Sequence, residues 1–215
     1  MSRVLPILFN TEMVRAILDG RKTCTRRLVK PQPKSKLCYT FAGSDSDTWG
    51  YPNRTAHEIC GEEFKLPNDI TEEELSKRWN PPYHTDDILY VRETWCGLPV
   101  NEAGHMRGHT IYYYKADGEL RPKGWRGTWH PSIHMPKEAS RIWLKVTDVR
   151  VERLQDMTDD DAEADGCFDY TSTALGFFDV WDSTIKKSDL DRYGWNANPW
   201  VWVIEVERCE KPEGV

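Results

Sequence analysis

Short strand patterns, widely separated along the chain, limit the folds that this sequence can adopt. Apolar runs and apolar–polar alternation predict strands at residues 4–9, 88–95, 111–115, 142–151 and 200–207. Helical patterns occur between some of these strands, but strand and helix do not alternate regularly, as they do in proteins with parallel sheets. We therefore expect an α+β fold, a small mixed β-barrel with peripheral helices and a long insertion.

The strand pattern at 142–151 contains a change of phase. Its apolar residues at 142, 144 and 146 share one face, whereas those at 149 and 151 are displaced by one residue. A displacement of one residue moves side chains to the opposite face of a sheet. We expect a bulge, a bend or a tight turn at 147–148, of the kind found where a strand rounds a barrel corner.

Three helices are predicted from their apolar stripes and end signals. An apolar stripe predicts the helix at 13–18, the capping-box pattern of Thr158 and Asp161 predicts the short helix at 159–165, and a second apolar stripe predicts the helix at 174–185. Gly20 and Gly166 follow the first two, and glycine after the last periodic residue is typical of a helix end because it adopts the left-handed conformation readily. We therefore expect the helix end to fix the position at which the basic segment after Gly20 begins.

The chain has 215 residues, which fits a single domain over 1–215. Within it we predict that 31–84 is an insertion and that 96–140 forms extended loops and a hairpin. The six cysteines contain no Cys-x-x-Cys pair, which favours reduced thiols. Apolar runs fall well short of the roughly 18 residues of a membrane span, so we expect no membrane partner.

Charge is distributed unevenly along a chain whose net charge is −6. Residues 20–36 carry lysine and arginine without an acid, whereas 156–169 carry aspartate and glutamate without a base. The basic segment is a candidate phosphate-facing patch. The alternative is a solvated loop with no ligand.

The segment 20–27 reads Gly-Arg-Lys-Thr-Cys-Thr-Arg-Arg and resembles the G-x-K-x-x-T-x-R signature of the ASCH family, a PUA-like barrel related to RNA-binding domains. Residues 86–93 resemble the family's next strand, with Asp86 in place of its glycine. Residues 158–166 resemble its acidic helix, and 200–207 its last strand. Longer stretches resemble a subset carried by bacteriophages and prophages, which implies the cytoplasm of a bacterium or of a phage-infected bacterium.

This resemblance implies a nucleoside or an RNA-type nucleic acid as ligand, and an amidohydrolase that removes the acyl group of a modified cytidine such as N4-acetylcytidine. Lys22 and Thr25 match the family's catalytic lysine and threonine, and Asp165 takes the place of its glutamate. A threonine hydroxyl becomes a nucleophile when a base removes its proton, a role that suits Lys22. Asp165 would orient the lysine or pass a proton to the leaving amine.

Other functions remain open at this point. Arg21, Arg26 and Arg27 are candidates for phosphate contacts in a non-catalytic module that binds RNA or modified DNA. A phage-encoded factor that binds a host protein is a further alternative. Ribonuclease activity is another, because the same residue types activate a 2′-hydroxyl.

Tryptophans are divided between packing and ligand contact. Trp143, Trp200 and Trp202 lie on strand patterns and are assigned to the core. Trp95, Trp125 and Trp129 lie at a strand end or in loops and are candidates for the wall of a pocket.

Histidine spacing does not predict a metal site. His130 and His134 are four residues apart, but Pro131 and Pro136 exclude the helix that would place both rings on one face. Glycines flank the other pair, at 105 and 109, in the same way. We expect no metal and no cofactor.

Overall fold

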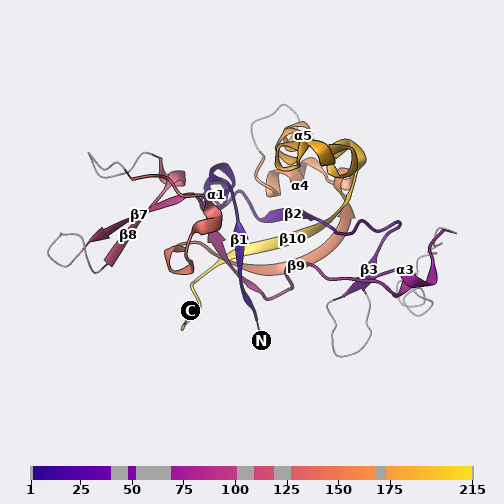
Figure 1. Cartoon of the computed structure of the whole chain (residues 1–215), viewed down its shortest axis with the longest axis horizontal. Helices are drawn as coiled ribbons and strands as arrows, with labels where there is room; N and C mark the ends of the chain where they lie inside the picture. The colour runs from indigo at the N-terminus through magenta and orange to yellow at the C-terminus, as the bar shows by residue number, and fades with distance from the viewer. Residues whose placement is uncertain are drawn as a thin grey trace. The chain divides into compact units, whose positions relative to one another are not determined.

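The computed structural model describes residues 2–39, 48–51, 69–100, 109–118, 127–167 and 173–214 (Figure 1). The chain divides into two compact units, each built from distant segments. Unit 1 contains Met1–Thr23, Asp86–Lys145 and Glu207–Val215, and unit 2 contains Cys24–Thr85 and Val146–Val206. The predicted insertion at 31–84 therefore lies within unit 2.

The strands form three open sheets. The largest has the hydrogen-bonded order β1 (Val4–Leu8), β6 (Ile88–Arg92), β9 (Trp143–Arg153), β10 (Trp200–Cys209) and β2 (Cys24–Leu28). The second contains β3 (Cys38–Tyr39), β4 (Trp49–Gly50) and β5 (Arg78–Trp79), and the third contains β7 (Trp95–Val100) and β8 (His109–Tyr114).

The α+β class is confirmed, but the barrel is not. Closing a barrel requires a hydrogen-bonded ladder between the two end strands of the sheet. Among the described residues, β1 and β2 remain the ends of the five-stranded sheet, and the additional strands pair with one another instead of closing it.

Unit 1 contains the parallel pair β1 and β6 and the helix α1 (Thr11–Leu18). The Asn10 side chain accepts a hydrogen bond from the Met13 backbone N–H at 2.8 Å and caps the helix. Gly20 has φ +76°, which confirms the predicted stop. The pairing of β7 with β8 also belongs to this unit.

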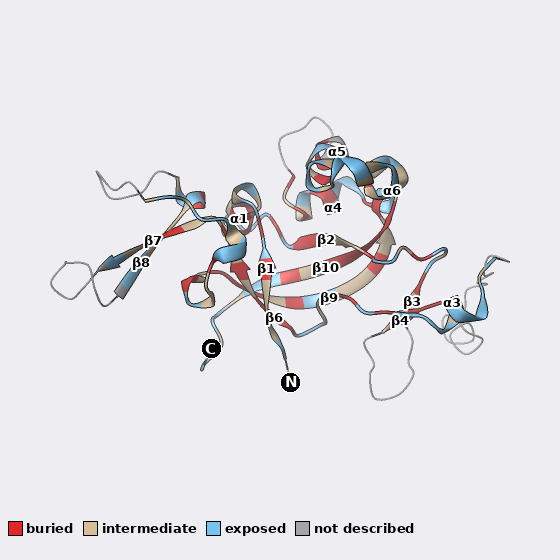
Figure 2. Ribbon diagram, viewed as in Figure 1, coloured by how far each residue is buried: buried red, intermediate tan, exposed pale blue. Residues whose placement is uncertain are grey.

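Unit 2 carries the helices α3 (Glu72–Ser76), α4 (Asp159–Ala164), α5 (Thr173–Thr184) and α6 (Leu190–Tyr193). A buried cluster joins α4 and α5 to β2 and β10, and it includes Cys24, Ala162, Phe177, Trp181, Val201 and Val203. Because β10 has strands on both sides and side chains packed on both faces, residues 200–204 are all buried (Figure 2). Trp143, Trp200 and Trp202 are buried, as predicted.

The phase change in β9 occurs without a turn. The strand continues through the predicted break, and Thr147 and Asp148 are both exposed in succession. Val146 is buried before this point and Val151 after it. The burial pattern therefore changes face at 147–148 while the strand continues, so a tight turn, one of the three expectations for this position, is not present.

Of the residues that the structure describes, no helix combines the length and the apolar character that crossing a membrane requires. The described cysteines, Cys24, Cys38, Cys96, Cys167 and Cys209, are free thiols.

Candidate functional site

Strand β2 carries the second half of the predicted motif, residues 24–27, and its side chains point to alternate faces. Cys24 and Leu28 pack into the cluster with α4 and α5, so Arg26, which lies between them, faces the same helices. Thr25 and Arg27 lie on the opposite face of β2. The five residues of this strand thus serve two different environments.

Arg26 is a buried member of an ion-pair network. Its side chain is 1% exposed, and its Nη1 lies 3.0 Å from Asp165 Oδ2. Its Nη2 lies 3.2 Å from Asp161 Oδ1, close enough for an ion pair but without hydrogen-bond geometry. Burial alone lowers the pKa of Arg26, but the charges of Asp165 and Asp161 outweigh it and raise that pKa. Arg26 therefore fastens the end of α4 to the sheet.

Helix α4 holds the two acidic partners in place. Thr158 and Asp161 form the predicted capping box, and Asp165 is the C-terminal cap residue before Gly166 at φ +99°. Burial raises the pKa of Asp161, but hydrogen bonds from Thr158 and the charge of Arg26 outweigh this and lower it. The carboxylates of Asp161 and Asp165 on this acidic helix therefore point toward Arg26 of β2.

Thr25 and Arg27 are in contact on the other face of β2. Arg27 Nη1 donates to Thr25 Oγ1 at 2.9 Å and to the Arg26 carbonyl at 3.0 Å. Burial lowers the pKa of Arg27, and the nearby Tyr83 and Asp165 offset this only in part. The pKa values of these two neighbouring arginines are therefore shifted in opposite directions, since that of Arg26 is raised.

Lys22 and Arg21 belong to unit 1. Lys22 is 4% exposed, and its ammonium lies 5.4 Å from the centre of the Phe9 ring. Its backbone N–H donates to the Ala16 carbonyl at 3.0 Å, which anchors the residue to the end of α1. Arg21 is exposed and pairs with Asp19 at 2.9 Å.

The candidate pocket tryptophans are placed as follows. Trp95 in unit 1 is half-buried, with its ring 5.1 Å from that of His130 and 5.7 Å from that of Tyr112. Within the described part of the chain, its Nε1 is buried and has no hydrogen-bond partner. Trp129 is half-buried, and Trp125 lies outside the described residues.

Two buried acids in unit 1 escaped the sequence prediction. Glu93 is 1% exposed, and Arg141 Nε donates to its Oε1 at 2.9 Å. Asp87 is 3% exposed and accepts from Arg3 Nε at 2.9 Å. Burial raises the pKa of Glu93, although the bond from Arg141 opposes this change. The sequence signal that could have identified them is their position, because Asp87 and Glu93 flank the buried strand pattern at 88–92.

Several motif residues are buried, which distinguishes the motif from an ordinary exposed basic surface. The buried polar residues of the described segments are Lys22, Thr25, Arg26, Asp87, Glu93 and Asp165. Four of these six are residues that the motif comparison selected. In the same segments, no group of three or more histidine, cysteine, aspartate or glutamate residues could hold a metal ion.

Comparison with known proteins adds no family assignment. No family model matches the chain, and neither a curated protein nor a solved structure matches it significantly. The resemblance of the 20–27 motif to the ASCH family therefore stays a prediction.

Proposed function

We propose that this protein is an ASCH-type, PUA-like protein that binds a nucleoside, free or within a single strand of nucleic acid, and that Lys22, Thr25 and Asp165 have the catalytic roles that the family resemblance implies. The proposed reaction is hydrolysis of an acylated base such as N4-acetylcytidine. The observation that carries the proposal is the burial of Lys22, Thr25 and Asp165, which are 4%, 2% and 5% exposed.

Burial favours a small enclosed ligand over a charged surface. Lysine is rarely fully buried, because removing its charge from water is unfavourable. A patch that grips phosphates through charge alone keeps its side chains accessible. A lysine and a threonine of one motif that are both buried are better suited to chemistry on a ligand than to long-range attraction.

The contact between Thr25 and Arg27 suits a nucleophilic role for the threonine. The Arg27 guanidinium donates to Thr25 Oγ1, so the hydroxyl keeps its own proton free to be donated. A positive charge at this oxygen also stabilises the negative charge that develops when the proton leaves.

In the proposed reaction Lys22 accepts this proton while Thr25 Oγ1 bonds to the acyl carbon. The C–N bond to the base breaks, and the proton passes to the amine that leaves. Water then hydrolyses the acyl ester, which releases the carboxylic acid and restores the threonine.

Mass spectrometry on wild-type protein incubated with N4-acetylcytidine tests the reaction. We expect cytidine and acetate as products, and no turnover with Lys22→Ala or Thr25→Ala. Thr23→Ala is a matched control, since Thr23 is an exposed threonine two residues before Thr25. Absence of turnover by the wild type, or equal loss in the Thr23 variant, would refute the hydrolytic mechanism.

A second candidate function is binding without catalysis, and the Arg26–Asp165 ion pair favours it. A carboxylate held 3.0 Å from a buried guanidinium is already engaged as an acceptor, which limits its use as a proton donor or acceptor. The resulting module would bind RNA or modified DNA.

Fluorescence anisotropy with single-stranded RNA and DNA oligonucleotides tests this second function. We expect affinity to fall steeply between about 50 and about 200 mM salt, with the log–log slope reduced by about one in Arg27→Ala. Fragmented RNA would instead indicate ribonuclease activity. If the protein shows neither turnover nor oligonucleotide binding, binding to a host protein is the remaining proposal.

A further inference from the structure

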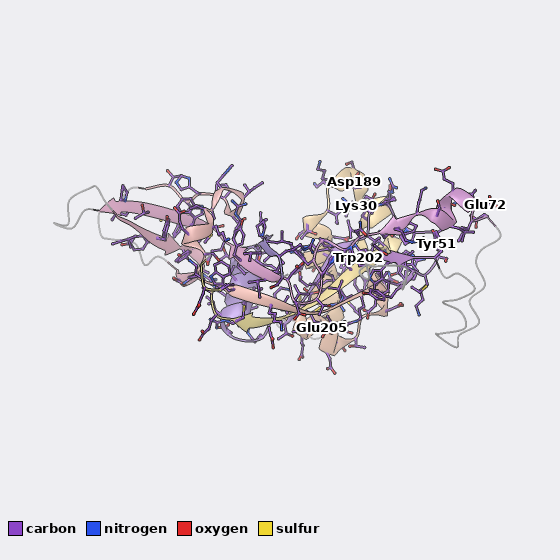
Figure 3. The ribbon with its side chains drawn as sticks, turned by 90° about the horizontal axis from the view of Figure 1, so that it is seen from below. Lys30, Tyr51, Glu72, Asp189, Trp202 and Glu205 are labelled. Carbon is purple, nitrogen blue, oxygen red and sulfur yellow. The ribbon has the colours of Figure 1, made fainter. Side chains whose placement is uncertain are left out.

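Three aromatic rings of unit 2 form a continuous row. The Tyr39 and Trp49 ring centres are 5.6 Å apart with their planes at 75°, and those of Trp49 and Trp202 are 5.9 Å apart at 72°. Tyr39 and Trp49 belong to the small sheet of the 31–84 segment. Strand β10 carries Trp202, which is labelled in Figure 3. We call Tyr39, Trp49 and Trp202 the aromatic row.

The aromatic row lies on the Thr25 and Arg27 face of β2. In the antiparallel register Trp202 is directly opposite Arg27, and Ile204 is opposite Thr25. Directly opposite residues of an antiparallel pair point to the same face, with their Cβ atoms about 4.5–5.5 Å apart. Trp49 therefore covers a face that already holds a hydroxyl and a guanidinium.

The inner ring of the aromatic row is less exposed than the outer two. Trp202 is 3% exposed, whereas Trp49 and Tyr39 are half-buried. Trp202 thus serves as a support in the interior, and the outer two rings keep surface that a ligand can contact. A tryptophan held by aromatic neighbours on both sides loses little further freedom when it stacks on a flat ligand.

We infer that Trp49 is the base-stacking residue of a pyrimidine nucleotide site, in which Arg27 binds the phosphate. The inference rests on the proposed nucleoside-binding function and assigns the 31–84 segment a part in recognition. A pyrimidine ring stacks on an aromatic face, and a guanidinium binds phosphate in a planar, bidentate manner.

Isothermal titration with cytidine 5′-monophosphate and with ribose 5-phosphate separates the two contacts. Both ligands carry the phosphate, but only the first carries a base. We expect Trp49→Ala to weaken binding of the nucleotide roughly ten- to a hundredfold, as loss of one stacked base does, and to leave binding of ribose 5-phosphate unchanged. Trp49→Phe keeps an aromatic face and should retain most of the affinity for the nucleotide.

Trp195→Ala is the matched control. Trp195 is also half-buried in unit 2, but it packs on Phe177 and Phe178 of α5, on the helix side of the sheet. This variant should bind the nucleotide as the wild type does. Equal loss of both ligands in Trp49→Ala, or equal affinity of the wild type for the two ligands, would overturn the stacking role.

A second measurement does not depend on the alanine variant folding. In protein labelled with 5-fluorotryptophan, the Trp49 ¹⁹F resonance is assigned from the spectrum of Trp49→Phe. It should shift with cytidine 5′-monophosphate and not with ribose 5-phosphate, and a shift with neither or with both refutes the inference. A wild type that binds no nucleotide by titration contradicts the proposed function itself.

Discussion

Removing the Asp165 carboxylate should destabilise the protein far more than removing a carboxylate from an exposed ion pair of the same length. In Asp165→Ala, Arg26 loses the oxygen 3.0 Å from its Nη1 while its side chain remains 1% exposed. Breaking a buried pair by removing one partner costs about 3–5 kcal/mol, because the remaining charge stays buried without compensation. Asp161, 3.2 Å from Arg26 Nη2, limits the loss in Asp165→Ala to about 3 kcal/mol, at the lower end of that range.

Thermal unfolding followed by circular dichroism measures this effect. For a chain of this size, about 1 kcal/mol shifts the Tm by about 2–4 °C, so we expect a decrease of about 6–12 °C. Asp19→Ala is the matched control. Asp19 pairs with Arg21 at 2.9 Å, but the two side chains are 58% and 39% exposed. Exposed pairs contribute about 0–1 kcal/mol, so the control should shift the Tm by at most a few degrees.

A double substitution separates charge from packing. Replacing a buried ion pair with apolar residues of similar volume is often neutral or stabilising. The variant Arg26→Met with Asp165→Leu should therefore be more stable than Asp165→Ala. If Asp165→Ala unfolds within about 2 °C of the wild type, or no differently from Asp19→Ala, the network does not fasten α4 to the sheet and the argument fails.

Three further predictions concern the helix end, the acidic helix and the threonine. Gly20→Ala should lower the Tm by about 2–4 °C, because a left-handed φ of +76° costs alanine about 1 kcal/mol while the added Cβ meets no atom within 4 Å. The pKa of Asp161 is lowered in the folded state, so its stabilisation is present above the unfolded pKa of about 3.9 and is lost as pH falls through the folded pKa. Unfolding curves from pH 6 to pH 2 should therefore show a smaller acid-induced loss for Asp161→Asn, and an unchanged loss would contradict the shift. Thr25→Val should abolish deacylation whereas Thr25→Ser retains it, and equal turnover in the two variants would exclude the hydroxyl as nucleophile.

Local signals in the sequence predicted the elements that local interactions determine. The stop at Gly20, the helix after Thr158 and the strand at 200–207 all agree with the structure. Each of these depends on residues within one or two turns of the chain, where capping and alternation act directly. Closure of the sheet could not be judged in this way, because it depends on pairing between strands that are far apart in the sequence, and the described strands do not close into the predicted barrel.

The small sheet could not be predicted from periodicity. Strands β3, β4 and β5 contain two residues each, which is too short for an alternating pattern to form. The rings of Tyr39, Trp49 and Trp202 pack together in this part of unit 2, and the contact between Trp49 and Trp202 joins segments more than 150 residues apart in the numbering. Composition alone predicted only an insertion.

The pairing of Arg26 with Asp165 was hidden for a similar reason, since 139 residues separate the two partners. The sequence presented Arg21, Arg26 and Arg27 as equivalent candidates for phosphate contact. In the structure Arg21 is exposed, Arg26 is buried against carboxylates and Arg27 bonds to Thr25. Equal charge therefore did not mean equal function.

The alternation of β2 explains why two adjacent arginines differ so strongly. A strand turns successive side chains to opposite faces, so a basic dipeptide within it necessarily divides between two environments. The face packed on α4 supplies acidic partners from the 159–165 helix, and Arg26 uses them for structure. The opposite face supplies a hydroxyl and an aromatic neighbour, a combination suited to an anionic, planar ligand. A basic run that lies on a strand should therefore be assessed one face at a time, and here that assessment favours Arg27 over Arg26 for the proposed ligand contact and assigns structural support to Arg26.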